Sequence, residues 1–231
     1  FMRLAQPMLS DFIHWRENRI PVLLLESPPL YRKTVFELSG QADGEEGDFL
    51  LSLDYEPLDC GEHLQVIRDY VSLSLDDRKL QNRFQSLLQG LIREGLAEQT
   101  DRLQREIHSY LQKVTLHLDY PVSCAQGDYV QPLLKALRYQ PVLDGAEPLE
   151  RLAQYIELYS GLMKHQCFVL VGAHSYFSPG ELKELYRTAF YQEWKLLLLE
   201  PGITEILPEE DVILLDKDFC ELHLDFSQQL L

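Results

Sequence analysis

The sequence predicts an α/β protein whose mostly parallel sheet is interrupted by an inserted helical domain. Three features of the 231-residue chain support this fold class. Two apolar runs flank an amphipathic segment between residues 166 and 201, a similar run ends near residue 25, and helical periodicity extends from residue 76 to residue 115. Strands that are apolar on both faces are typical of parallel sheets, in which a crossover helix usually makes each connection.

The segment from residue 166 to residue 201 predicts a strand–helix–strand unit. Cys167–Val171 and Trp194–Leu199 are short apolar runs without polar alternation, so each predicts a buried strand. Between them Ser178 is a candidate helix cap, Pro179 suits the first helical turn, and Glu181 completes a capping box. One face of this helix carries Leu182, Leu185, Tyr186 and Ala189. Two parallel strands joined in this way form a right-handed unit.

The first part of the chain predicts further strands of the same sheet. Pro21–Leu25 continues into Glu-Ser-Pro much as Leu196–Leu199 continues into Glu-Pro, which predicts two central strands that end at one edge. Leu30–Leu38 fits either a strand or a helix. Asp48–Leu53 predicts a strand that forms a hairpin with residues 33–38. The remaining predictions are a strand or short helix at Leu64–Val71 and a closing strand at Val212–Leu215.

A long amphipathic helix is predicted from Asp76 to Thr115, where apolar residues recur at helical spacing. Uninterrupted, it would be about 55 Å long at a rise of 1.5 Å per residue. Gly90, Gly95 and Thr100 are the positions at which it would bend or break. Its period is close to that of a coiled coil, so the helix requires a partner helix.

Two later segments are candidates for that partner. Asp128 can cap a helix that carries Val130–Leu137, and Pro148 can open another that extends to Met163. We therefore predict an α/β head domain and an inserted helical leg domain. The head comprises residues 1–75 and 165–231, and the leg comprises residues 76–164.

The charge of the chain is unevenly distributed. The formal net charge is −16, but residues 76–164 hold 11 Lys and Arg against 12 Asp and Glu, a net charge of −1. The remainder holds 10 basic and 25 acidic residues, a net charge of −15. A strongly acidic surface repels nucleic acid, so phosphate contacts are expected in the middle of the chain.

Basic residues of the predicted leg form a candidate DNA-binding face, and two arginines of the head are placed to extend it. The candidates are Arg78, Lys79, Arg83, Lys135 and Arg138 in the leg, and Arg16 and Arg19 in the head. The alternative interpretation is a solvated helix face on which basic and acidic side chains are interspersed.

Other functional classes find little support. Residues 171–178 contain one glycine and residues 26–29 none, so neither segment offers the glycine pattern that cradles nucleotide phosphates. His174 and Ser175 are adjacent in sequence, and adjacent side chains rarely face each other, so they predict a loop pair without catalytic function. We expect neither a nucleotide cofactor nor enzymatic activity.

The composition predicts a cytoplasmic protein without disulfides. The four cysteines are scattered and form no Cys-x-x-Cys pair. No apolar run approaches the roughly 20 residues that a membrane span needs, and no signal peptide is visible. We therefore expect no membrane partner.

Four segments carry a resemblance to a known family: Phe168–Gly172, Ser178–Leu182, Leu196–Pro201 and Asp211–Asp216. Together with the order of an N-terminal strand, an inserted helical bundle and further strands, they resemble the Csn-two family, which accompanies spacer acquisition in type II-A CRISPR systems. The matching residues are mostly core and turn residues. The resemblance therefore concerns the fold more than any site.

The resemblance implies a head with P-loop-NTPase-like topology that lacks the nucleotide motifs. It also implies a homotetrameric ring that takes double-stranded DNA ends through a positively charged hole, with the integrase complex and the RNA-guided nuclease of the same system as partners. Calcium ions would steady the legs. Residues 115–128 offer only Asp119 and Asp128 as carboxylate ligands, whereas calcium takes six to eight oxygens.

The leading hypothesis is therefore a non-catalytic adaptor that binds DNA without sequence preference. Two alternatives belong to other classes. One is a nucleotide-binding or nucleotide-hydrolysing α/β enzyme with an atypical phosphate loop, and the other is a helical scaffold that binds only protein.

Overall fold

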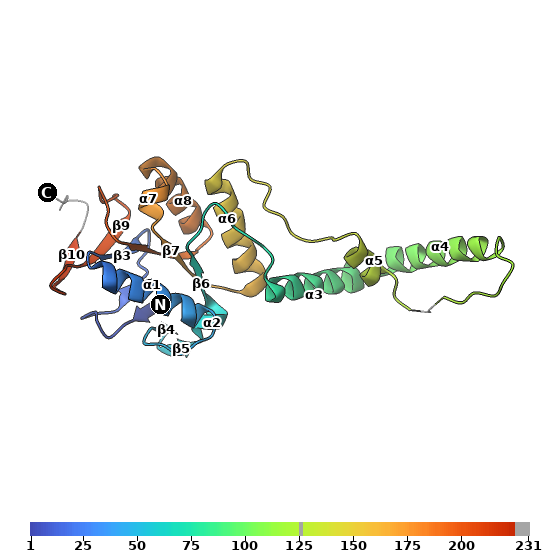
Figure 1. Ribbon diagram of the computed structural model, residues 1–231, viewed down its shortest axis with the longest axis horizontal. Coiled ribbons are helices and arrows are strands. Elements are labelled where there is room, and N and C mark those ends of the chain that lie inside the picture. The colour runs from blue at the N-terminus through green and yellow to red at the C-terminus, as the bar shows by residue number, and fades with distance from the viewer. Residues whose placement is uncertain (125–126, 225–231) are drawn as a thin grey trace. The chain divides into compact units, whose positions relative to one another are not determined.

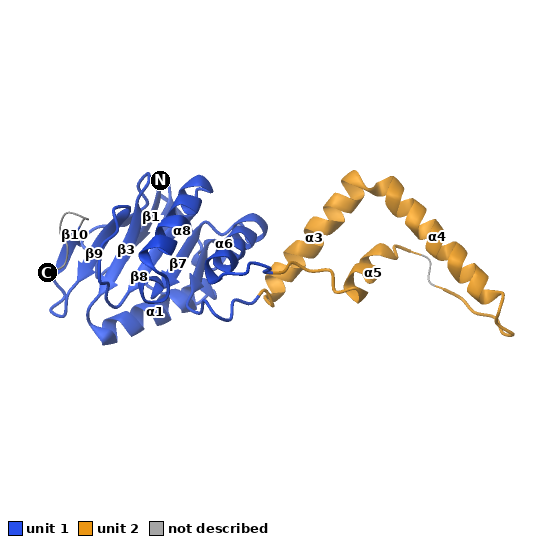
Figure 2. Ribbon diagram, turned by 90° about the horizontal axis from the view of Figure 1, so that it is seen from above, with its two compact units in different colours: residues 1–74, 143–231 blue, residues 75–142 orange. Residues whose placement is uncertain are grey.

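The computed structural model describes residues 1–124 and 127–224, and the chain divides into two compact units (Figure 2). Unit 1 comprises Phe1–Ser74 and Leu143–Leu231, and unit 2 comprises Leu75–Val142. The inserted segment therefore ends at Val142, whereas the sequence analysis extended it to residue 164. The reason is that the helix that follows packs into unit 1.

Unit 1 is built on a six-stranded sheet with the strand order β10-β9-β3-β8-β7-β6 (Figure 1). Every neighbouring pair is parallel except β10 with β9. The strands are β3 (Ile20–Leu25), β6 (Leu64–Ile67), β7 (Cys167–Val171), β8 (Lys195–Glu200), β9 (Glu210–Leu215) and β10 (Glu221–Leu224). The predicted α/β class with a mostly parallel sheet is confirmed.

The strand–helix–strand unit is also confirmed. Strands β7 and β8 are adjacent and parallel, and they are joined through α7 (Ala173–Tyr176) and α8 (Pro179–Tyr191). Ser178 accepts a hydrogen bond from the Glu181 N–H, and the Glu181 carboxylate accepts one from the Ser178 N–H, which is the predicted capping box. In the register, Val22 of β3 lies opposite Leu198 of β8. The two similar apolar runs are thus neighbouring central strands.

The two faces of this sheet are covered by different elements (Figure 1). One face carries Leu23, Leu25, Val169 and Leu197, which share a buried cluster with Leu38 of α1 (Pro28–Ala42) and with residues of a second, smaller sheet. Alternate strand residues point to the other face. On that face lie α8 and α6 (Pro148–Leu158), and α6 is followed by the π-helix η1 (Tyr159–Met163).

The position of α6 explains the revised boundary of the insert. Leu152 and Ile156 are fully buried, and Tyr155 accepts a hydrogen bond of 2.9 Å from Gln65 of β6, a strand of the large sheet. Pro148 opens the helix as predicted, and Glu147 and Glu150 form its capping box. Apolar spacing predicted the helix but could not show which domain its buried face packs against.

The smaller sheet has the order β2-β1-β4-β5 and is antiparallel throughout. Its strands are β1 (Met2–Ala5), β2 (Ile13–His14), β4 (Leu50–Leu53) and β5 (Glu56–Leu58), and α2 (Cys60–His63) leads from it to β6. The predicted hairpin between residues 33–38 and Asp48–Leu53 is wrong. Residues 33–38 belong to α1, which buries Thr34, Leu38 and Gln41 at helical spacing, so β4 pairs with β1 and β5 instead.

Unit 2 contains α3 (Arg78–Gly95), α4 (Ala97–Thr115) and α5 (Val130–Ala136). The predicted long helix ends at Gly95, because Leu96 leaves the helical conformation at φ −125° and ψ 17°. Gly95 was one of the three predicted break points. Across the described ranges, no helix is both long and apolar enough to span a membrane.

Candidate nucleic-acid interface

Helix α3 carries more basic residues than any other helix in the described part of the chain. It contains Arg78, Lys79, Arg83 and Arg93 but only one acidic residue, Glu94. The Asp77 carboxylate caps its first turn by accepting a 2.7 Å hydrogen bond from the Lys79 N–H. Unit 2 as a whole holds nine basic and eight acidic residues, a net charge of +1, whereas the rest of the chain holds 12 and 29, a net charge of −17.

The basic residues of α3 share one sector of the helix. At about 100° per residue, Arg78, Lys79 and Arg83 fall within one half of the circumference, and Arg93 falls in the same half. All four side chains are exposed, whereas Leu80, outside this sector, is fully buried. Arg93 belongs to the row of basic residues that the sequence places along the predicted helix, although it was not among the residues singled out for DNA binding. The arrangement suits contacts with a row of phosphates.

Lys135 and Arg138 lie on and just after α5 and are also exposed. Arg138 adopts a left-handed backbone conformation with φ 51°, directly after the helix ends. Within residues 1–124 and 127–224, no ion pair involves Lys135, Arg138 or the basic residues of α3. These charges are therefore not neutralised by neighbouring carboxylates.

Arg16 and Arg19 have a different environment, in unit 1. Both guanidinium groups face Asp211, at 3.8 Å from Arg16 and 3.6 Å from Arg19, and Arg19 also donates a hydrogen bond to the carbonyl of Pro208. The carboxylate partly offsets their charge. Because Asp211 is almost two hundred positions away in the sequence, only the pairing of β3 with β9 reveals this contact.

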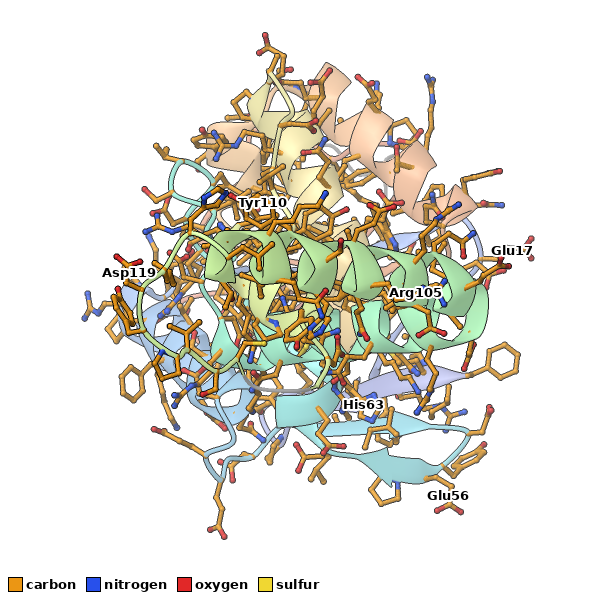
Figure 3. All side chains as sticks on the ribbon, turned by 90° about the vertical axis from the view of Figure 1, so that its right-hand side faces the viewer. Glu17, Glu56, His63, Arg105, Tyr110 and Asp119 are labelled. Atoms are coloured by element: carbon orange, nitrogen blue, oxygen red, sulfur yellow. The ribbon has the colours of Figure 1, made fainter. Side chains whose placement is uncertain are left out.

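The two candidate metal ligands do not form a calcium site within one chain. Asp119 is exposed in the segment that follows α4, and Figure 3 shows it together with Arg105 and Tyr110, two residues of α4 itself. One carboxylate oxygen of Asp128 is already engaged with the Val130 N–H at 2.8 Å and the Gln104 amide at 3.2 Å. No group of three or more His, Cys, Asp or Glu that could hold a metal occurs in the described part of the chain. These residues do not fit calcium, which takes six to eight oxygens.

A buried polar cluster lies behind the β7–α7 turn in unit 1. His174 Nε2 lies 2.8 Å from the Glu210 carboxylate, which also accepts hydrogen bonds from the Tyr186 hydroxyl at 2.5 Å and the Leu207 N–H at 2.8 Å. Burial lowers the pKa of His174, but the hydrogen bond and charge of Glu210 outweigh it, so the net shift is upward. His174 is thus a satisfied structural histidine, and the neighbouring Ser175 is exposed.

Glu200 belongs to the same region and was missed by the sequence analysis. It ends β8, is fully buried, and accepts a 3.1 Å hydrogen bond from the His174 N–H and another from the Ala173 N–H. Its Oε2 atom has no hydrogen-bond partner in the described structure. Burial raises the pKa of the Glu200 carboxyl to about 7. A glutamate that directly follows four leucines was the available signal.

The same edge of the sheet is unlike a phosphate cradle. Helix α1 starts with Pro28 and Pro29, which have no N–H groups to offer an anion, and the Tyr31 N–H bonds to the Ser27 carbonyl. In the β7–α7 turn the N–H groups of Ala173 and His174 are already bonded to the Glu200 carboxyl. This chemistry gives no support to the nucleotide enzyme considered above.

Comparison with known proteins gives one family match. A family model described as "CRISPR-associated protein (Cas_Csn2)" matches residues 41–219, well over half of the chain. No curated protein matches the chain.

Similar solved structures include an inward-facing ABC transporter of the metal-chelate type, with 10% identity and a TM-score of 0.41, covering 94% of this chain and 75% of that one. Another is cbiO1 of Clostridium perfringens, part of the ABC transporter complex cbiONQ, with 12% identity and a TM-score of 0.39, covering 87% and 76%. Scores this low bear on neither the fold nor the function.

Proposed function

Since the chain belongs to the Cas_Csn2 family of CRISPR-associated proteins, we propose that it is a non-catalytic adaptor that binds double-stranded DNA ends during spacer acquisition. The observation that carries the proposal is the exposed basic sector of α3, in a unit of net charge +1 within a chain of net charge −16. Arginine and lysine on such a sector contact backbone phosphates, so binding is independent of base sequence.

Assembly into a homotetrameric ring is part of this proposal. Unit 2 exposes large apolar side chains on its helices, among them Leu87, Leu91, Leu103 and Tyr110. A helical surface of this kind is typical of an interface with another helix. A second copy of the chain provides a matching surface through a twofold contact. A ring with leg-to-leg and head-to-head contacts brings four basic sectors to one DNA duplex.

The large sheet supports the part of the proposal that concerns the topology of the head. The parallel strand order β9-β3-β8-β7-β6 suits a P-loop-NTPase-like head. In such a head the two prolines at the start of α1 and the buried Glu200 replace the phosphate loop. We place the protein in the cytoplasm, with the integrase complex and the RNA-guided nuclease of its CRISPR system as partners.

The test is a salt titration of DNA affinity, measured by fluorescence anisotropy with a linear duplex. The variants are Arg78→Ala/Lys79→Ala/Arg83→Ala and Lys135→Ala/Arg138→Ala. The logarithm of affinity falls with the logarithm of salt concentration by about 0.9 for each phosphate contact. In a tetramer four copies of each contact are lost together, so we expect both variants to lower the slope by several units.

The matched control is Lys183→Ala/Arg187→Ala on α8, which removes two positive charges from unit 1 and should leave the slope unchanged. Equal slopes for all proteins would place the DNA on another surface and reject the proposal. A closed-circular duplex that binds as tightly as the linear one would reject the preference for ends.

A further inference from the structure

A cavity of about 630 Å³ lies in unit 1, whereas the basic sector of α3 belongs to unit 2. It opens where β7 and β8 begin, at the edge of the sheet opposite to Glu200. Trp15, Trp194, Met2 and Leu53 supply its apolar walls, and Lys164 and Lys195 supply positive charge. Its volume is within the range of ordinary ligand-binding pockets, about 300–1,000 Å³.

The charge at this cavity is opposite to that of its surroundings. Unit 1 has a net charge of −17, yet the lining contains two lysines and one carboxylate, that of Glu193. Neither lysine forms an ion pair within the residues that the structure describes. Two ammonium groups beside an apolar wall therefore remain available to an anion.

The walls of the cavity are held in fixed positions. The Trp15 indole donates a 2.7 Å hydrogen bond to the Leu196 carbonyl, and both Trp15 and Trp194 are buried. Lys164, directly after the π-helix η1, and Glu193 both adopt left-handed backbone conformations, with φ of 61° and 59°. Both residues follow the end of a helix, η1 and α8 respectively, where a left-handed residue is a common way to end the helix and fixes the direction of the chain. A ligand would thus meet a preformed surface.

We propose that this cavity binds a short acidic peptide segment of a partner protein. A large apolar side chain of the segment packs against Trp15 and Trp194, and its carboxylates pair with Lys164 and Lys195. Several wall residues, including Lys164 and Glu193, are exposed, so the cavity is too open to enclose a small molecule. The surrounding charge of −17 repels a nucleic acid, which would extend well beyond the two lysines, but a peptide with two or three charges contacts only the cavity.

The tryptophan fluorescence of the protein provides a direct test, because Trp15 and Trp194 are its two tryptophans and both line the cavity. The probe is the capped peptide Glu-Asp-Phe-Glu-Leu, titrated into the 231-residue protein. We expect a saturable change in emission that weakens with salt. Lys164→Ala/Lys195→Ala should weaken binding by about tenfold or more, since a hydrogen bond to a charged group is lost at each lysine.

The controls separate this proposal from its alternatives. Lys33→Ala/Lys217→Ala removes two exposed lysines elsewhere in unit 1 and should leave peptide affinity unchanged. Absence of a saturable change, equal affinity for a peptide with lysine in place of its acidic residues, or equal affinity in both double variants would overturn the proposal.

Two competitors distinguish other occupants of the cavity. Phenylacetate binding as tightly as the peptide would assign the cavity to a small molecule, and a DNA duplex that competes with the peptide would assign it to DNA. Lys164→Ala/Lys195→Ala should not alter the salt slope for DNA, so this proposal and the proposed function can fail separately.

Discussion

Replacement of the buried Glu200 by glutamine should change how the stability of the protein depends on pH. Burial raises the pKa of the Glu200 carboxyl from its ordinary value of 4.5 to about 7. Between these values the folded state holds a proton that the unfolded state has released, so the free energy of unfolding falls as pH rises. The full difference corresponds to about 3 kcal/mol, of which about 2 kcal/mol falls between pH 5.5 and pH 8.5.

The side chain of Glu200→Gln has no proton to release. Between pH 5.5 and pH 8.5 the free energy of unfolding of this variant should therefore fall by about 2 kcal/mol less than that of the wild type. Glutamine keeps an acceptor oxygen for the N–H groups of Ala173 and His174, and any cost of its unpaired amide is the same at every pH. The assay is urea denaturation followed by tryptophan fluorescence at several pH values. Glu184→Gln, an exposed position on α8, is the control and should match the wild type. Parallel pH profiles for Glu200→Gln and the wild type would refute the assignment of a proton to this buried carboxyl.

Three further changes test other contacts. His174→Ala should lower the urea midpoint, because it leaves the buried Glu210 carboxylate without its imidazole partner. DNA affinity measured by anisotropy should stay within about twofold of the wild type, both for this variant and for Ser175→Ala at an exposed position. A large loss of affinity in either variant would assign the turn to the DNA site. Ser178→Ala removes the cap of α8 and should cost about 1 kcal/mol in the same denaturation assay, and no loss would mean that the capping box contributes nothing. Leu91→Glu places a charge on the exposed apolar side of α3 and should shift light scattering to smaller species, whereas Gln89→Glu on its polar side should not; an unchanged assembly would exclude this side as an interface.

Much of the large sheet could be predicted because its information is local. Runs such as Phe168-Val169-Leu170 are apolar at every position, and such runs form strands only where both faces are covered. The start of α8 was predicted to the residue since Ser178 and Glu181 satisfy each other's backbone groups within one turn. In contrast, the small sheet includes strands of two to four residues, too short for a periodic pattern to predict.

By itself, the sequence determined the fold class, the central strands, the crossover helix, the uneven charge and three candidate break points of the long helix, of which Gly95 is the one used, because each depends on residues close together in the chain. Only the tertiary structure decided which elements meet. It placed α6 in unit 1, paired Asp211 with Arg16 and Arg19, and buried Glu200 beside the His174 turn. These contacts join residues that are far apart in sequence, and their energy depends on burial and on the distance between charges, which no local pattern encodes.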